Sequence, residues 1–208
     1  MPTLKILNGI RRFQDQFRAD SERLVRLATE GQRPHVLMIA CSDSRVAPEL
    51  ITGAELGDLF VVRTVGNVVP PFGTGEGSLG TAIEYAVLHL HVQHVVVCGH
   101  TCCGCLRGLE SVPDWNREPH IARWIEHARP AKTKVEASGL PAEELALAVA
   151  RENVLLQLQN VRSYDAAREA ERSGKVTLHG WVYRLETGAI EAYDAESGGW
   201  MALGVDAG

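Results

Sequence analysis

Five cysteines stand at positions 41, 98, 102, 103 and 105, and the last four fall within eight positions. An odd number of cysteines packed so closely is a poor basis for a disulfide framework. Metal or thiol chemistry is therefore the better expectation for this chain.

Two polar segments carry the chemically useful side chains. Cys41 and Asp43 lie in the segment CSDSR, and His100 and Cys103 lie in the segment GHTCCGC. Two thiolates and an imidazole are good zinc donors, and Asp43 could be a fourth ligand or a hydrogen-bonding base. Cys41 and Asp43 project to the same side of an extended chain, and a turn that enters a helix places His100 and Cys103 on one side.

Each polar segment follows a short apolar run that has the length of a β-strand. These runs are residues 35–41 and 94–98, and a third run covers residues 59–64. Continuous apolar runs are typical of a parallel sheet that is covered on both faces. Ligands bind beyond the carboxyl ends of the strands in such sheets, so we expect the two polar segments to meet at that edge.

The remaining periodicity supplies the elements around this sheet. Helical spacing of apolar residues covers 4–30, 81–91, 118–128 and 141–172, and Glu186-Thr-Gly188 separates two strand-like runs at 176–185 and 189–193. The pattern predicts an α/β fold with a mostly parallel central sheet flanked by helices, an N-terminal helical arm and a C-terminal antiparallel hairpin. We expect one domain over 1–208, with residues 1–31 as the arm.

Composition excludes several classes of protein. The 208 residues are 45% hydrophobic and 23% charged, as in an ordinary globular protein, and the formal net charge is -5. Lys and Arg are scattered, which argues against nucleic-acid partners and anionic membranes. No apolar run approaches the roughly 18 residues of a membrane-spanning helix, and the first 20 residues do not have the pattern of a signal peptide. We expect a cytoplasmic protein with reduced thiols.

Five motifs in order make the chain resemble the β-class carbonic anhydrases over nearly its whole length. They are CSDSR at 41–45, GDLFVVRTVGNVVPP at 57–71, GTAIEYAVLHL at 80–90, VVVCGHTCCG at 95–104 and LHGWVYRLETG at 178–188. The resemblance implies a zinc-dependent lyase, carbonate dehydratase, that hydrates carbon dioxide reversibly to bicarbonate and a proton.

The resemblance also assigns the site. It implies one zinc ion per chain on Cys41, His100 and Cys103, and the choice of Cys103 over Cys102 rests on it. Asp43 and Arg45 would form the catalytic dyad that orients a zinc-bound hydroxide.

A plant-like, open type of site is implied by further positions. The bicarbonate-inhibited type carries a tryptophan three residues before the first ligand, where this chain has Met38. The plant-like type has a glutamine nine residues before that ligand, which Gln32 matches. Substrate-binding positions are matched by Phe60, Val65 and Tyr85, and the backbone N–H of Gly104 is a candidate for a second hydrogen-bond donor to substrate.

Two further expectations follow from the family. His89, one turn after Tyr85, resembles a proton-shuttle position, and the alternative is a partly exposed histidine without a role. The N-terminal arm would wrap a partner subunit, which implies a homodimer or a higher homo-oligomer; the alternative is a helix packed on its own sheet.

Three alternative interpretations stay open. Carbonyl sulfide or carbon disulfide could be attacked at the same zinc site. All four donors could close around a structural or thiol-sensing zinc, although Arg45 beside Asp43 argues against this. Cys102 and Cys105 form a Cys-x-x-Cys pair that suggests redox chemistry. That interpretation would leave Cys41 and Asp43 unexplained, so packing or incidental exposure is the better expectation for Cys98, Cys102 and Cys105.

Overall fold

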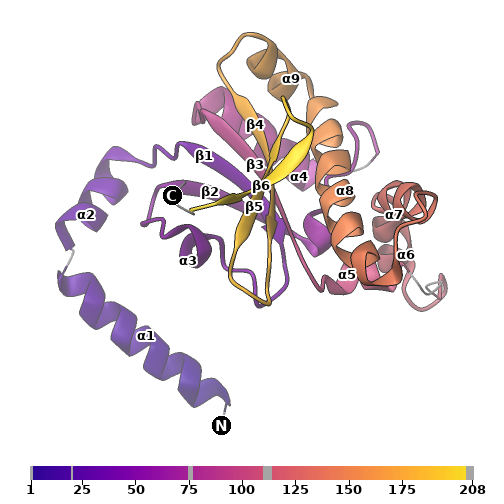
Figure 1. Cartoon of the computed structure of the whole chain (residues 1–208). Helices are drawn as coiled ribbons and strands as arrows, with labels where there is room; N and C mark the ends of the chain where they lie inside the picture. The colour runs from indigo at the N-terminus through magenta and orange to yellow at the C-terminus, as the bar shows by residue number, and fades with distance from the viewer. Residues whose placement is uncertain (1, 20, 75–76, 110–113, 205–208) are drawn as a thin grey trace. The chain divides into compact units, whose positions relative to one another are not determined.

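The computed structural model describes residues 2–19, 21–74, 77–109 and 114–204 (Figure 1). The chain divides into two compact units, residues 1–33 and residues 34–208. The boundary lies close to the expected end of the arm at residue 31, and a single domain over 1–208 stays a prediction. None of the described helices combines the length and the apolar character needed to cross a membrane.

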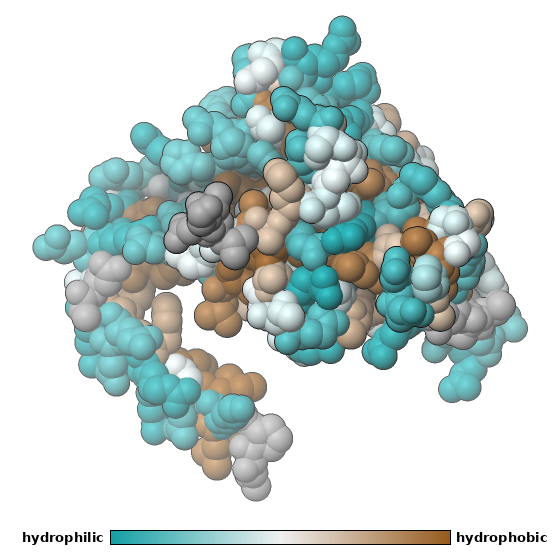
Figure 2. All heavy atoms as spheres, viewed as in Figure 1, coloured by the Kyte–Doolittle hydropathy of each residue, from teal (hydrophilic) through white to brown (hydrophobic). Residues whose placement is uncertain are grey.

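The first unit consists of two helices rather than the single helix expected over 4–30. These are α1 (Pro2–Ala19) and α2 (Ser21–Glu30), and residue 20 between them lies outside the described residues. Apolar side chains gather along α1 (Figure 2), and six of them are exposed: Leu4, Ile6, Leu7, Ile10, Phe13 and Phe17. An exposed apolar stripe of this length is a feature of surfaces that meet a partner.

The second unit is built on a six-stranded sheet in the order β2-β1-β3-β4-β5-β6. Its strands are β1 (Val36–Cys41), β2 (Leu59–Thr64), β3 (His94–His100), β4 (Thr177–Tyr183), β5 (Ile190–Asp194) and β6 (Gly199–Leu203). The first four strands in this order run parallel, and β5 and β6 are antiparallel to their neighbours. The mostly parallel sheet is confirmed, and the expected hairpin is extended by β6, which the sequence pattern missed.

Helices flank this sheet (Figure 1). They are α3 (Pro48–Thr52), α4 (Gly77–Glu84), α5 (Gly104–Gly108), α6 (Pro119–Glu126), α7 (Arg129–Glu136), α8 (Ala142–Arg162) and α9 (Asp165–Arg172), with a 3-10 turn η1 (Val65–Asn67) and a π-helical turn η2 (Tyr85–His89). β1 and β3 lie inside the sheet and are buried almost throughout, which explains their continuous apolar sequences.

The single helix expected over 141–172 is also wrong, because the chain leaves the helix at Tyr164. Tyr164 has extended backbone angles, its side chain is buried, and its hydroxyl donates to the Pro70 carbonyl at 2.9 Å. Ser163 accepts a hydrogen bond from the Phe72 N–H at 2.8 Å. These contacts with the 70–72 loop separate α8 from α9.

Glycines let α8 pack closely against the sheet beside the site. A Cβ at Gly99 on β3 would lie 2.7 Å from Val154 Cγ2, and one at Gly180 on β4 would lie 2.9 Å from Val154 Cγ1. Both distances are too short for real carbon contacts. Because Gly99 precedes His100, this contact also sets the position of a residue that the sequence assigns to the site.

We predict that Gly99→Ala lowers the free energy of unfolding by about 1–3 kcal/mol, since the new methyl group overpacks Val154. Urea unfolding at fixed protein concentration measures the change. Val154→Ala in the same chain should restore part of the loss. Gly77→Ala, where a Cβ meets nothing within 4 Å, serves as the matched control, and equal effects of the two substitutions would contradict the account.

Candidate metal centre

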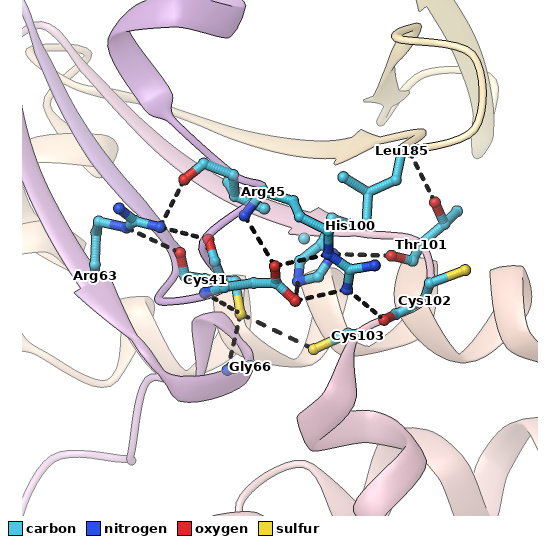
Figure 3. Close-up of polar contacts among 12 residues, drawn as sticks. Cys41, Arg45, Arg63, Gly66, His100, Thr101, Cys102, Cys103 and Leu185 are labelled. Carbon is cyan, nitrogen blue, oxygen red and sulfur yellow. Dashed lines mark hydrogen bonds and ion pairs between the residues drawn. The ribbon is translucent and has the colours of Figure 1, made fainter. Parts of the chain in front are cut away.

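Three metal-ligating side chains converge at the carboxyl ends of β1 and β3. The ligand atoms of Cys41, His100 and Cys103 all lie within 4.8 Å of one another. Cys41 ends β1, His100 ends β3, and Cys103 stands directly before α5. Figure 3 shows the two sulfur atoms and the imidazole turned toward one another. Their residues are 4%, 1% and 3% exposed, so water contributes little to holding them in place.

The Cys41 sulfur sits in surroundings that stabilise a thiolate. It lies 4.0 Å from Cys103 Sγ, and it accepts hydrogen bonds from the backbone N–H of Asp43 at 3.4 Å and of Gly66 at 3.3 Å. The hydrogen bond from Cys103, with smaller contributions from His100 and the backbone donors, holds the pKa of Cys41 well below its usual range against the effect of burial. The same pairing and burial raise the pKa of Cys103. The pairing therefore favours a thiolate at Cys41 over one at Cys103.

Glycine is required at position 66 both by its backbone conformation and by the space around it. Its φ of +72° is in the left-handed region, and a Cβ there would lie 2.7 Å from Cys105 Sγ. The close approach of Cys105 packs the loop that carries the Gly66 N–H toward Cys41. Cys105 therefore packs against Gly66, which agrees with one of the two roles that the sequence left open for it.

His100 offers one nitrogen to the cluster and uses the other to fix its orientation. His100 Nδ1 lies 2.8 Å from the Thr101 carbonyl oxygen, which can only accept, so Nδ1 carries the proton. His100 Nε2 is buried and has no hydrogen-bond partner among the described residues. An unpartnered buried nitrogen beside two sulfur atoms fits a zinc ion, which takes two Cys and one His in many sites.

Asp43 lies beside this cluster and accepts hydrogen bonds from Arg45. Arg45 donates to Asp43 Oδ1 through its backbone N–H at 3.0 Å and through Nε at 2.9 Å, and to Oδ2 through Nη2 at 2.7 Å. These hydrogen bonds hold the pKa of Asp43 well below its usual range and raise the pKa of Arg45. Asp43 Oδ2 is also 3.9 Å from His100 Nε2, so the carboxylate faces the cluster while it stays on the guanidinium.

Arg63, which the sequence pattern did not single out, holds the same segment from the other side. It lies on β2, and its guanidinium donates to the carbonyl oxygens of Cys41 at 3.1 Å and of Asp43 and Val46 at 2.6 Å. One side chain thereby fixes three carbonyls of the turn that presents Cys41 and Asp43. An arginine inside a strand sequence, FVVRT, was the available signal, since a charge at such a position needs partners.

Three of the expected site residues, Phe60, Tyr85 and His89, bring their rings together in the second unit. The Tyr85 ring centroid is 5.9 Å from that of Phe60 and 5.4 Å from that of His89, which stacks on it. Tyr85 and Val65 are about half exposed, and the Val65 carbonyl accepts a hydrogen bond from Trp124 Nε1 at 2.7 Å.

Two expected substrate-binding positions remain. Gly104 begins α5 directly after Cys103, with its backbone N–H in the first turn. Gln32 belongs to the first unit. The roles of all these positions, Gln32 included, stay predictions.

All five cysteines are free thiols. Burial raises the pKa of Cys98 to about 12 and that of Cys105 to about 11, and a hydrogen bond to Glu186 raises that of Cys102. A redox Cys-x-x-Cys pair needs a thiol with a lowered pKa. These surroundings therefore disfavour redox chemistry at Cys102 and Cys105.

Comparison with known proteins agrees with this geometry. The carbonic anhydrase family model matches residues 36–190. A carbonic anhydrase of Pseudomonas aeruginosa is 42% identical over 200 residues, which are 95% of this chain and 90% of that protein. The solved β-carbonic anhydrase CcaA is 36% identical, with a TM-score of 0.91 over 97% of this chain and 100% of that one. The chain belongs to the β-class carbonic anhydrases.

Other solved members of the class share the fold at lower identity. Tetrameric β-carbonic anhydrases from the filamentous ascomycete Sordaria macrospora include a chain that is 26% identical, with a TM-score of 0.78 over 97% of this chain and 100% of that one. Carbonic anhydrases of this class are zinc enzymes, and the structure brings Cys41, His100 and Cys103 together as a cluster that could hold a metal ion.

We predict that Arg63→Gln speeds the loss of zinc about 10–100-fold, because the turn that presents Cys41 loses its three-carbonyl support. Competition with a colorimetric chelator measures zinc loss. Arg63→Lys should fall between wild type and Arg63→Gln, since one ammonium cannot span three carbonyls. The exposed Arg172→Gln is the control, and unchanged zinc retention in Arg63→Gln would refute the role.

We also predict that the metal-free protein carries one cysteine thiolate per chain at pH 7. Thiolate absorbance near 240 nm should fall only as the pH drops below the usual cysteine range, and Cys41→Ser should abolish it. Zinc binding at pH 7 should then release about one proton per chain, from Cys103, because ligand thiols must be deprotonated. Release of two protons would mean that Cys41 is a neutral thiol before zinc binds, which would contradict the prediction.

Proposed function

We propose that this carbonic anhydrase converts carbon dioxide reversibly to bicarbonate and a proton, with zinc held by Cys41, His100 and Cys103. The observation that carries the proposal is the unpartnered, buried His100 Nε2 among two sulfur atoms and a carboxylate that Arg45 holds. Zinc in this place would supply a hydroxide at neutral pH by lowering the pKa of a bound water.

Asp43 and Arg45 have different roles beside the metal position. Because its pKa is held well below the usual range, the Asp43 carboxyl group is ionised at neutral and alkaline pH. It can therefore only accept hydrogen bonds, and it would orient the attacking group through one. Arg45 satisfies both carboxylate oxygens, which favours an Asp43 that stays on the guanidinium and leaves one metal position open. A carboxylate without such a partner would be free to bind the metal itself.

The two thiolates also shape the dependence on pH. Together with a neutral imidazole they cancel the charge of a divalent ion, whereas three neutral histidines would leave that charge in place. A water at a site of this kind is acidified less, so we expect activity to rise toward alkaline pH.

An apolar wall and a proton route complete the proposal. We assign Phe60, Val65 and Tyr85 to the wall that a nonpolar gas prefers, and Gln32 and the Gly104 N–H to hydrogen bonds with substrate oxygen. His89, exposed and stacked on Tyr85, can carry protons to solvent.

We also propose the plant-like, open type of site. Met38, three residues before the first ligand, is fully buried in β1, and Gln32 stands nine residues before that ligand. The hydrogen bonds from Arg45 to Asp43 support the open type, in which the carboxylate stays off the metal.

The assembly is proposed to be a homodimer or a higher homo-oligomer. The exposed apolar stripe of α1 and the half-exposed Tyr85 support a surface that meets a second copy. Tetramers in the Sordaria macrospora relatives agree with this. Five free thiols suit a reducing compartment such as the cytoplasm.

We predict that Asp43→Ala lowers kcat/KM for carbon dioxide hydration by about 100-fold or more, with zinc content unchanged, because the orienting acceptor is lost. Stopped flow with a pH indicator from pH 6.5 to 9 measures it. Asp43→Asn, which keeps the shape but not the charge, is the matched variant. Bound zinc with no hydration by the wild type at any pH would overturn the proposed reaction, and carbonyl sulfide would then be tested.

A further inference from the structure

We propose that Glu186, in the turn between β4 and β5, is a positioning residue for both His100 and the Asp43–Arg45 pair. The inference rests on the proposed function and adds a residue that is remote in sequence from every predicted site position. The chain of contacts starts at one carboxylate and ends at the two halves of the site.

One Glu186 carboxylate holds two consecutive residues of the ligand loop. Its Oε2 accepts a hydrogen bond from Thr101 Oγ1 at 2.7 Å, and its Oε1 accepts one from Cys102 Sγ at 3.3 Å. Thr101 and Cys102 are the two residues between His100 and Cys103. The hairpin turn therefore ties down the whole link between two metal ligands.

The hydrogen bond to Thr101 connects Glu186 with the His100 imidazole. Thr101 Oγ1 also accepts from the Leu185 N–H at 2.9 Å, and the Thr101 N–H donates to the Tyr183 carbonyl at 3.0 Å. With its amide and its hydroxyl fixed by the hairpin, Thr101 presents its carbonyl to His100 Nδ1 at 2.8 Å. That contact selects the tautomer that leaves Nε2 free for a metal.

The Cys102 branch reaches the dyad. The Cys102 carbonyl accepts from Arg45 Nη2 at 3.1 Å, and the same Nη2 donates to Asp43 Oδ2 at 2.7 Å. Cys102 has a φ of +55°, in the left-handed region, which a non-glycine residue keeps only when its surroundings enforce it. The thiol contact with Glu186 is one such restraint. Figure 3 shows the Cys102 carbonyl turned to the Arg45 guanidinium.

A carboxylate suits this place better than an amide. Thr101 and Cys102 both donate, so the two acceptor oxygens of Glu186 are both used, whereas a glutamine has one acceptor oxygen and an NH₂ that only donates. The turn itself is closed by backbone hydrogen bonds between Arg184 and Ala189 at 2.8 Å and between Gly188 and Arg184 at 2.8 Å. Replacing the Glu186 side chain thus leaves the backbone of the turn closed and removes its hold on the loop, together with an ion pair to Arg184 Nε at 3.8 Å.

The test is Glu186→Gln and Glu186→Ala in the zinc-loaded full chain. We expect kcat for carbon dioxide hydration to fall about 10–100-fold with KM little changed, and zinc to be lost faster from the variants. The control is Glu196→Gln, which makes the same change at an exposed carboxylate in the next turn and should leave both quantities unchanged. The visible spectrum of the cobalt-substituted protein should shift in the Glu186 variants, because His100 and its neighbours move.

A second pair of variants separates positioning from a general loss of structure. Thr101→Ser keeps the hydroxyl and should retain wild-type kcat, while Thr101→Val, of equal size, should reproduce the part of the Glu186→Ala effect that runs through Thr101. Combining Thr101→Val with Glu186→Ala should cost less than the sum of the two single effects, since both break the hydrogen bond between Thr101 and Glu186.

The outcomes separate this inference from the proposed function. Wild-type kcat, zinc retention and cobalt spectrum in Glu186→Gln and Glu186→Ala would overturn the positioning role. An inactive zinc-loaded wild type would instead overturn the proposed function, and the cobalt spectra and zinc loss of the Glu186 variants would still decide whether Glu186 positions the ligand loop.

Discussion

β1 and β3 lie side by side and parallel, and this pairing is the constraint on which the site depends. Ala40 is paired with Cys98, so Cys41 and His100 reach the same edge of the sheet from adjacent strands. Parallel strands bring their carboxyl ends together, and a helix follows β3 directly, which adds Cys103 to the same corner. Gly99 lets α8 pack closely against β3, and Gly180 lets it pack against β4. Because Gly99 precedes His100, this packing also helps to fix the position of His100.

Guanidinium and amide side chains elsewhere in the second unit hold the site at the ends of β1 and β3 through hydrogen bonds. Arg63 fixes the carbonyls of the first ligand segment, and Arg45 fixes the carboxylate. A buried ladder of amides on α8 holds the loop behind Cys41: Asn153 Nδ2 donates to the Gly66 carbonyl at 3.1 Å, and Gln157 Oε1 accepts from the Val69 N–H at 2.8 Å. Since the Gly66 N–H donates to the Cys41 sulfur, α8 supports Cys41 through the Asn153 side chain and the Gly66 backbone.

Local sequence was sufficient for the features that depend on local patterns. Apolar runs predicted the strands, and the position of Cys41 and His100 at strand ends predicted that they would meet. The choice between Cys102 and Cys103 could not come from spacing. The structure separates them, because Cys102 takes a left-handed backbone and is exposed while Cys103 is buried in the cluster.

Contacts between residues that are far apart in the chain could not be predicted from the sequence. Arg63 meets carbonyls some 20 positions away, Glu186 meets Thr101 from 85 positions away, and Tyr164 breaks a helical pattern because a loop 94 positions earlier accepts its hydroxyl. Each is a polar side chain whose partner is fixed only by the strand order. β6 was missed because its strand follows a turn in a segment with little alternation.

The central claim is that the Asp43–Arg45 ion pair persists beside a zinc ion held by Cys41, His100 and Cys103. A crystal structure of the zinc-loaded protein at pH 8 to 8.5 tests it most directly. The account predicts zinc on the two sulfur atoms and His100 Nε2, with the Asp43 carboxylate still on the Arg45 guanidinium. An Asp43 carboxylate that has left Arg45 for the zinc, or zinc bound elsewhere, would contradict it.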